Sequence, residues 1–327
     1  MRRLKIAMVL LTALALPLLA PNNAFAAKVF ISNEKDNTVS VIDSKTLKVL
    51  KTINVGQRPR GITLAKDDKW LLICTSDDNR IEVYDTNTYK LIKNLPSGPD
   101  PELFDLHPSG NPLYIANEDD NIVTVVDIDS GKILAEIPVG VEPEGMAVSP
   151  DGKTIINTSE TTNMAHFINA ETQETYANVL VDNRPRVAQF TADGSEIWVS
   201  AEIGGTVTVI DAKTQKKKHT ITFQIQGINA DAIQPVGIRI DKADNKAYVA
   251  LGPANRVAII DAKTYKVEKY LLVGQRVWNL YFVDDEKYLF TTNGTSNDVS
   301  VIDVKKRRVI KSIRVGRYPW GVVATKK

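Results

Sequence analysis

Short stretches of alternating apolar and polar residues recur along the chain from residue 28 to its end. The segment Val41-Ile42-Asp43 has a counterpart every 42 residues, with a single step of 50 residues. The counterparts are Val83-Tyr84-Asp85, Val125-Val126-Asp127, Phe167-Ile168-Asn169, Val209-Ile210-Asp211, Ile259-Ile260-Asp261 and Val301-Ile302-Asp303. A fixed period of this length is typical of repeat folds. The eight additional residues of the long step fall between Thr222 and Gln234, which predicts one longer loop there.

Each repeat predicts four short strands. In the third copy they cover residues 103–107, 113–117, 122–127 and 133–139, which are rich in Val and Ile and are separated by turn residues. A chain of this size is too long for one pair of packed sheets, whereas small sheets arranged radially can bury its apolar residues. The sequence therefore predicts an all-β fold, a seven-bladed β-propeller with four antiparallel strands per blade.

The two ends of the repeat region predict how the ring closes. The first strand, residues 28–32, corresponds to the second strand of a blade, and the last strand, residues 321–325, corresponds to a first strand. We therefore expect the C-terminal strand to complete the N-terminal blade.

Comparison of the seven copies with one another separates the positions that every blade needs from those that vary. One constant column consists of Asn37, Asn79, Asn121, Asn163, Gly205, Asn255 and Asn297. Asn and Gly tolerate positive φ, so this column predicts hairpin turns. In six of the seven copies, the column that begins with Asp43 is followed three residues later by Thr or Ser. This pattern favours a turn in which the Asp accepts hydrogen bonds from backbone amides over a metal site.

The first 26 residues have the pattern of a secretory signal peptide. Basic residues at the start precede an apolar stretch over residues 6–20 and the small-residue site Ala24-Phe25-Ala26. The predicted organisation is a signal peptide, residues 1–26, followed by a single propeller domain, residues 27–327, in the periplasm or outside the cell. No later segment is apolar enough to predict a membrane span.

Charge and cysteine content narrow the classes of function. Without residues 1–26, the chain has 38 basic and 39 acidic side chains, a balance that does not favour nucleic-acid binding. Cys74 is the only cysteine, so no intrachain disulfide can form. It lies within an apolar run, where we expect a buried, unreactive thiol. The sequence has no Cys-x-x-Cys-His motif for covalent haem attachment.

Several segments resemble the repeat of the YVTN family of β-propellers. They are FISN at 30–33, NTVSVID at 37–43, TINVG at 52–56 and PEGMAVSPDGK at 143–153. The resemblance covers nearly the whole chain after the signal peptide. Together with the SNEKDN segment at 32–37, the length and the signal peptide, it is most similar to the periplasmic propellers associated with pyrroloquinoline quinone (PQQ)-dependent alcohol catabolism.

Two variable columns flank the proline at which each new blade begins, at the predicted mouth of the central channel. The column before the proline contains Arg58, Asp100, Glu142, Arg184, Gln234, Arg276 and Tyr318. The column after it contains Arg60, Glu102, Glu144, Arg186, Val236, Trp278 and Trp320. Acidic residues cluster in two adjacent blades and basic residues in the next. This arrangement suits a small anionic ligand or the charged patch of a partner, but the Arg and Glu side chains of neighbouring blades could equally pair with one another.

The resemblance implies a binding or accessory module, without a cofactor or metal, that docks on a periplasmic dehydrogenase, cytochrome or transporter component. The alternative is a lactonase-like or lyase-like enzyme that acts on a small anionic substrate, with Glu102 and Glu144 facing one channel. No catalytic residue is assigned. The repeat also resembles the d1-haem domain of nitrite reductases, which has eight blades and an axial histidine that this chain lacks. Some YVTN propellers bind single-stranded DNA, but the basic clusters here lie on predicted turns without aromatic neighbours.

Overall fold

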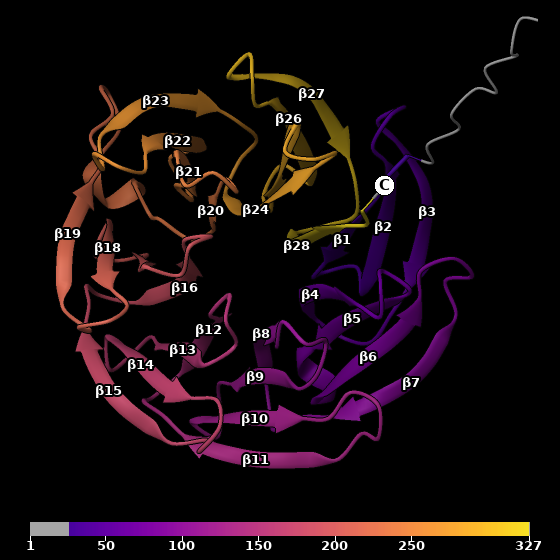
Figure 1. Cartoon of the computed structure of the whole chain (residues 1–327). Coiled ribbons are helices and arrows are strands. Elements are labelled where there is room, and N and C mark those ends of the chain that lie inside the picture. The colour runs from indigo at the N-terminus through magenta and orange to yellow at the C-terminus, as the bar shows by residue number, and fades with distance from the viewer. Residues whose placement is uncertain (1–25, 327) are drawn as a thin grey trace, which may run out of the picture.

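The chain forms a ring of seven four-stranded antiparallel sheets in a computed structural model that describes residues 26–326 (Figure 1). The predicted seven-bladed β-propeller is therefore confirmed. The predicted signal peptide, residues 1–26, lies outside the described residues except for Ala26, and it stays a prediction. Within the described part of the chain, no helix has the length and apolar character that a membrane span requires.

Each blade has one strand at the channel, two middle strands and one outer strand. From the inside outwards, blade 1 contains β28 Pro319–Ala324, β1 Lys28–Asn33, β2 Thr38–Asp43 and β3 Lys48–Asn54. Blade 2 contains β4 Pro59–Ala65, β5 Trp70–Thr75, β6 Arg80–Asp85 and β7 Leu91–Pro96. Blade 3 contains β8 Pro101–Leu106, β9 Leu113–Asn117, β10 Ile122–Val126 and β11 Ile133–Pro138.

The remaining blades follow the same order around the ring. Blade 4 contains β12 Pro143–Val148, β13 Thr154–Ser159, β14 Met164–Asn169 and β15 Thr175–Leu180. Blade 5 contains β16 Pro185–Phe190, β17 Glu196–Ala201, β18 Thr206–Asp211 and β19 Lys217–Thr222. Blade 6 contains β20 Ile238–Ile240, β21 Lys246–Ala250, β22 Arg256–Asp261 and β23 Val267–Leu272. Blade 7 contains β24 Val277–Val283, β25 Tyr288–Asn293, β26 Asp298–Asp303 and β27 Arg308–Arg314.

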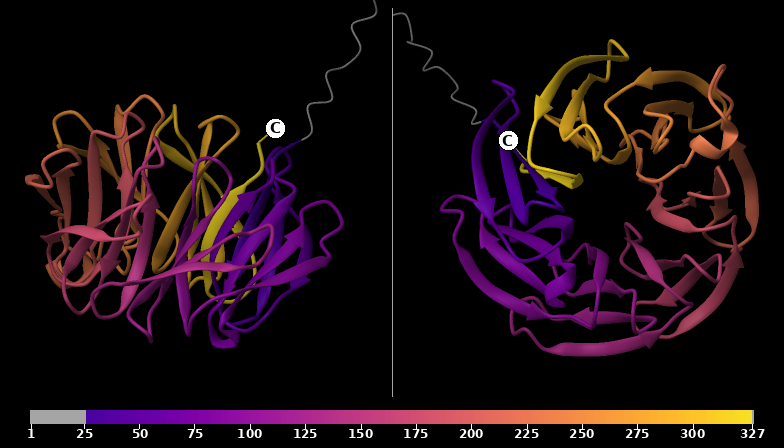
Figure 2. Two further views of the ribbon diagram at one scale, coloured as in Figure 1. Left: turned by 60° about the horizontal axis from the view of Figure 1, so that its bottom comes forward. Right: turned by 180° about the vertical axis from the view of Figure 1, so that it is seen from behind.

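The ring closes as predicted, by pairing between the two ends of the chain. Strand β28 pairs antiparallel with β1, with Phe30 opposite Val323 and Ile31 opposite Val322. Figure 2 shows the C-terminal strand, in yellow, beside the indigo N-terminal blade in both of its views. The longer loop is also confirmed: it connects β19 to β20 and contains a short 3-10 helix, η2 Ala230–Ala232.

The apolar cores lie between the blades. On β13, Ile155 packs in a cluster with Tyr114 and Val123 of blade 3, whereas the next residue, Ile156, packs with Ile197 of blade 5. Successive side chains of a strand point to opposite faces of its sheet, so each middle strand contributes to two cores. Full burial of such a side chain stabilises the fold by roughly 1.5–3 kcal/mol.

Both constant columns have the turn geometry that the sequence predicts. The six asparagines and Gly205 have φ between 53° and 68°. In the second column, Oδ1 of Asp43 accepts hydrogen bonds from the backbone N–H groups of Lys45 and Thr46 at 3.0 and 2.6 Å. Such bonds stabilise the ionised carboxylate, so these aspartates act as turn residues.

Candidate functional site

The asparagine column has a second role that the sequence did not predict. Oδ1 of Asn37 accepts a hydrogen bond from the backbone N–H of Arg58 at 3.0 Å, and the other five asparagines make the same contact with the next crossing. The residue whose N–H donates this hydrogen bond also has positive φ, 51° at Arg58 and 59° at Glu142. Backbone of this kind costs of the order of 1–3 kcal/mol in a residue other than glycine. Each asparagine therefore fixes the crossing that presents the charged side chains of the mouth.

Glu102 is fully buried at the mouth and is paired with two arginines of the preceding blade. NH2 of Arg58 lies 2.5 Å from its Oε1, and NH1 of Arg60 donates to its Oε2. Arg58 also contacts Asp100 at 2.8 Å, and Arg60 lies 3.4 Å from Glu34. All of these acids therefore have a guanidinium partner.

Arg186 is the centre of a second buried network. Its side chain is 5 % exposed; NH2 lies 2.8 Å from Oε1 of Glu144, and NH1 donates to Oε1 of Glu160. Arg184, with 46 % of its side chain exposed, lies on the solvent side and contacts Glu160 at 2.7 Å. Glu202 joins this network to blade 7 through NH2 of Arg276 at 2.5 Å.

Each of the two tryptophans of the mouth lies beneath an arginine side chain. The guanidinium carbon of Arg60 is 5.7 Å from the ring centre of Trp320, and that of Arg276 is 4.1 Å from the ring centre of Trp278. Trp320 is 1 % exposed. Contacts of this type add an electrostatic attraction to the packing of the ring.

Most side chains that follow the proline column are buried. We call the layer that they form the mouth layer; it consists of Arg60, Glu102, Glu144, Arg186, Val236, Trp278 and Trp320. Burial lowers the pKa of Arg60, but the carboxylates of Glu102, Glu144 and Glu34 raise it by more, so the guanidinium stays charged. The alternative that neighbouring blades pair their charges is thus confirmed for Arg58, Arg60, Arg184 and Arg186.

Only the outer rim of the mouth is left open. A hollow of about 570 Å³ is lined by Glu118, Glu142, Glu160, Thr161, Asn163, Asn183, Arg184 and Ile203. Burial, and then the nearby carboxylates of Glu102 and Asp100, raise the pKa of Glu118 to about 7. Asp100, Glu102 and Glu118 have carboxylate oxygens within 4.8 Å of one another, but Arg58 already pairs with the first two. Ligand binding by the predicted mouth residues stays a prediction.

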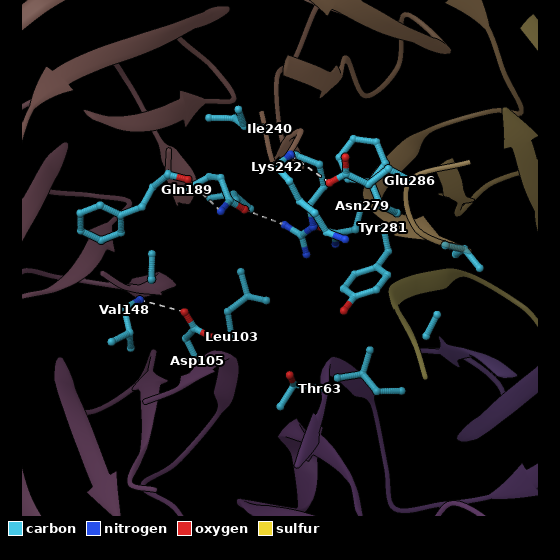
Figure 3. A pocket seen from close by; sticks show the side chains of 18 of the residues that line it. Thr63, Leu103, Asp105, Val148, Gln189, Ile240, Lys242, Asn279, Tyr281 and Glu286 are labelled. Atoms are coloured by element: carbon cyan, nitrogen blue, oxygen red, sulfur yellow. Dashed lines mark hydrogen bonds between the residues drawn. The ribbon is translucent and has the colours of Figure 1, made fainter. Parts of the chain in front are cut away.

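A larger cavity occupies the other half of the channel. Its volume is about 720 Å³, and residues of all seven inner strands line it, from Ile62 on β4 to Ala324 on β28. Residues of the opposite face, including Lys242 and Glu286, complete its rim. Figure 3 shows Asp105, Gln189, Asn279 and Tyr281 among the side chains around it. We call this space the far cavity, because its lining shares no residue with that of the hollow at the mouth.

One column of the repeat, four residues after the proline, supplies much of the far-cavity wall. Its members are Thr63, Asp105, Ala147, Gln189, Arg239, Tyr281 and Val323, of which the first six line the cavity. In six blades the pairing of the inner strand shifts between the proline position and the third residue after it, whereas β20 of blade 6 pairs with β21 in regular register. Such a bulge reverses the alternation, so the fourth residue after the proline faces the channel together with the first. The sequence analysis did not predict this third variable column as part of a site.

The histidines and the cysteine have packing roles. Nε2 of His166 accepts a hydrogen bond from Gly140 N–H at 3.0 Å, and the ring of His219 stacks on Tyr265 at 4.9 Å. His107 contacts the carbonyl oxygen of Gly152. Cys74 is fully buried, and burial raises the pKa of its thiol. The predicted burial of Cys74 is thus confirmed.

Comparison with known proteins identifies the family. A family model described as the choice-of-anchor I domain matches residues 120–317. The chain belongs to this family. A second model, described as "Lactonase, 7-bladed beta-propeller", matches residues 29–148. No curated protein matches the chain. The finer resemblance to YVTN propellers and PQQ-dependent systems stays a prediction.

Solved structures with the same fold include three proteins of different description. Hydrazine synthase of Kuenenia stuttgartiensis is 22 % identical, with a TM-score of 0.77 over 84 % of this chain and 92 % of that one. A protein of Desulfotomaculum acetoxidans, titled as functionally unknown, is 15 % identical, with a TM-score of 0.74 over 91 % and 98 %. The dihydro-haem d1 dehydrogenase NirN is 13 % identical, with a TM-score of 0.69 over 90 % and 74 %. At these identities the similarity establishes the fold alone.

Proposed function

We propose that this chain is an exported propeller that works by binding a small molecule in the far cavity. The observation that supports this function best is the cavity itself, about 720 Å³ in volume, whose wall combines apolar side chains with nearly as many polar and charged ones. Sites for small ligands commonly have this volume, and their polar groups fix the orientation of the ligand. The mouth layer, in contrast, already pairs its own charges.

Export and an accessory role belong to the same proposal. The signal-peptide pattern of residues 1–26 supports a periplasmic location, and the repeat motifs support a link to PQQ-dependent alcohol oxidation. In that setting the propeller would deliver or sense a ligand for a dehydrogenase, cytochrome or transporter component. The open rim of the mouth, with Arg184 and the 59 % exposed Ile203, offers a surface for such a partner.

The lactonase model that matches residues 29–148 favours a second candidate, hydrolysis of a lactone. The carboxylates suggested for this role, Glu102 and Glu144, are 0 and 2 % exposed and are bound to Arg60 and Arg186. A substrate would have to displace these partners before it could reach either carboxylate. The binding function requires no such opening, so we favour it.

The test is to look for ligands with the wild-type protein and a variant whose cavity is filled. Thr63 is half-buried in the wall of the far cavity, so Thr63→Trp should occupy part of it without touching the mouth layer. Native mass spectrometry of protein secreted by the producing cells, followed by a thermal-shift screen of small metabolites, should find ligands for the wild type that the variant does not bind. Equal binding by both proteins would contradict the proposal. Lactone turnover that Glu102→Gln abolishes would favour the second candidate instead.

A further inference from the structure

Arg239 differs from every arginine of the mouth layer. It lies on β20, the shortest inner strand, next to the inserted loop. Its NH1 donates to the carbonyl oxygen of Ile238 at 2.8 Å and to Oε1 of Gln189 at 3.3 Å. Within residues 26–326, no carboxylate lies within ion-pair distance of its guanidinium, and its Nε and NH2 donate to no protein group. One edge of the guanidinium is fixed, and the other faces the far cavity.

The surroundings make this unpaired charge unfavourable. Burial lowers the pKa of Arg239, and the nearby Tyr281 and Asp105 offset this only in part. Arg239 is half-buried, and a partly buried charge without an ionic partner is unfavourable. A carboxylate held by two parallel N–H groups is the partner that best compensates a guanidinium. Two lysines also line the cavity: Lys242 contacts Oδ1 of Asp285 at 2.6 Å, and Lys326 is exposed to solvent.

Tyr281 completes the cationic side of the cavity. The guanidinium carbon of Arg239 lies 5.5 Å from the centre of the tyrosine ring, which helps to orient it. In Figure 3 the tyrosine side chain points into the cavity with its hydroxyl foremost. Burial raises the pKa of this phenol, so at neutral pH the hydroxyl stays protonated and can donate to an anion. Guanidinium and phenol thus provide donors on the same side.

The opposite wall offers an acceptor. Asp105 lies on β8 of blade 3, across the ring from β20 of blade 6 (Figure 1). Its two carboxylate oxygens each accept one backbone N–H, from Leu106 at 2.9 Å and from Val148 at 2.8 Å. Each oxygen keeps a free lone pair, which suits a hydroxyl donor. Between the two poles the lining is largely apolar and includes Leu103 and Ile240.

We propose that the far cavity binds a small organic acid with an apolar body and a terminal hydroxyl group. Its carboxylate pairs with the free edge of Arg239 and with the Tyr281 hydroxyl, and its hydroxyl donates to Asp105. This assignment rests on the proposed binding function and names the class of ligand. No bond is made or broken: the site recognises the acid and releases it.

The test uses calorimetric titration of the purified propeller with matched probes. They are the unbranched acids from butanoate to octanoate, their ω-hydroxy derivatives, hexanamide and hexan-1-ol. We expect the best ω-hydroxy acid to bind at least about tenfold more tightly than the amide, the difference expected for a bidentate charged pair. Arg239→Met should remove this preference. Arg239→Lys keeps the positive charge but not the two parallel N–H groups of a guanidinium, so it should retain part of the preference. Asp105→Asn should reduce only the advantage of the hydroxyl group.

The matched control is Arg307→Met, whose guanidinium pairs with Glu268 at 2.8 Å and does not line the cavity, so the variant should leave the affinity unchanged. Circular dichroism and thermal melting establish that each variant is folded. Equal affinity of acid and amide, or an unaffected Arg239→Met, would overturn the assignment. If Thr63→Trp still abolished binding in that case, the result would support the proposed binding function and contradict only the proposed class of ligand. If Thr63→Trp left every probe bound, the proposed function would fall as well.

Discussion

The two halves of the channel hold arginines in opposite situations. At the mouth, Arg186 lies among Glu144, Glu160 and Glu202, and these carboxylates raise the pKa of its guanidinium although burial alone would lower it. In the far cavity, burial lowers the pKa of Arg239, whose partners are neutral oxygens. The first arrangement pairs the charge of the arginine with carboxylates, whereas the second pairs it with neutral oxygens only.

This difference separates a structural from a binding role for the same residue type. A buried ion pair is damaged by loss of either partner, because the remaining charge has no compensation. An arginine kept without a partner lowers the stability of the empty protein, and a ligand can compensate it on binding. The presence of arginines in the variable columns of the repeat therefore does not by itself identify the binding site. The following variants test this comparison.

The largest effect is expected from Arg186→Met. Glu144 and Glu160 would keep their burial and lose the guanidinium that bridges them. The free energy of unfolding should fall by about 3–5 kcal/mol, the range found when one partner of a buried pair is removed. Urea denaturation measures it. Arg184→Met, at a side chain that is 46 % exposed, is the control and should lower the free energy by less than about 1 kcal/mol. Similar values for both variants would contradict the buried network.

Asp105→Asn should change how stability depends on pH. Burial raises the pKa of Asp105 from 3.8 to about 6, so the folded protein binds more protons than the unfolded chain between these values. Ionisation of this group therefore lowers the free energy of unfolding as pH rises through that window, by roughly 2–3 kcal/mol in total. The variant should show a correspondingly smaller decrease. Denaturation at several pH values measures this decrease, and identical profiles for the variant and the wild type would contradict the raised pKa of Asp105.

Asn121→Ala tests the framework that holds the mouth. The change forces a positive φ on alanine and removes the hydrogen bond from Glu142 N–H to Oδ1 of Asn121. We expect a loss of about 1–2 kcal/mol. Asn121→Gly keeps the turn and loses only the hydrogen bond, so it should lose about half as much. Equal losses for the two variants would mean that the hydrogen bond carries the effect alone.

The smallest change is expected from Arg239→Met in the absence of ligand. The variant removes a charge without a carboxylate partner and retains the apolar stem, so unfolding should require the same free energy or up to about 1 kcal/mol more. This outcome is opposite in sign to that of Arg186→Met. Parallel urea denaturation of the two variants makes the comparison direct. A loss of several kcal/mol at Arg239 would show that a protein group compensates its charge.

The repeat in the sequence determined the fold almost completely. Its period, the alternation within each copy and the frame at the two ends predicted seven blades and the pairing of β28 with β1. These features are local: a strand is set by alternation, and a turn by residues such as Asn37 that accept positive φ. Gly205 is the one member of this column that is not an asparagine, and it precedes the lengthened loop between β19 and β20. A glycine has no side chain that could accept the backbone hydrogen bond that Asn37 accepts from Arg58.

The site depended on information that the repeat does not contain. The sequence placed the charged columns at the mouth, but only the packed ring shows that Glu102 lies within reach of both Arg58 and Arg60. Such pairing depends on how the side chains of neighbouring blades are placed relative to one another, which the composition of the chain does not determine. The far cavity was missed for a different reason: side chains of all seven inner strands form its wall, and these strands come together only when the ring closes. Arg239 on β20 and Asp105 on β8 are far apart in the sequence, so they meet one cavity only in the folded ring.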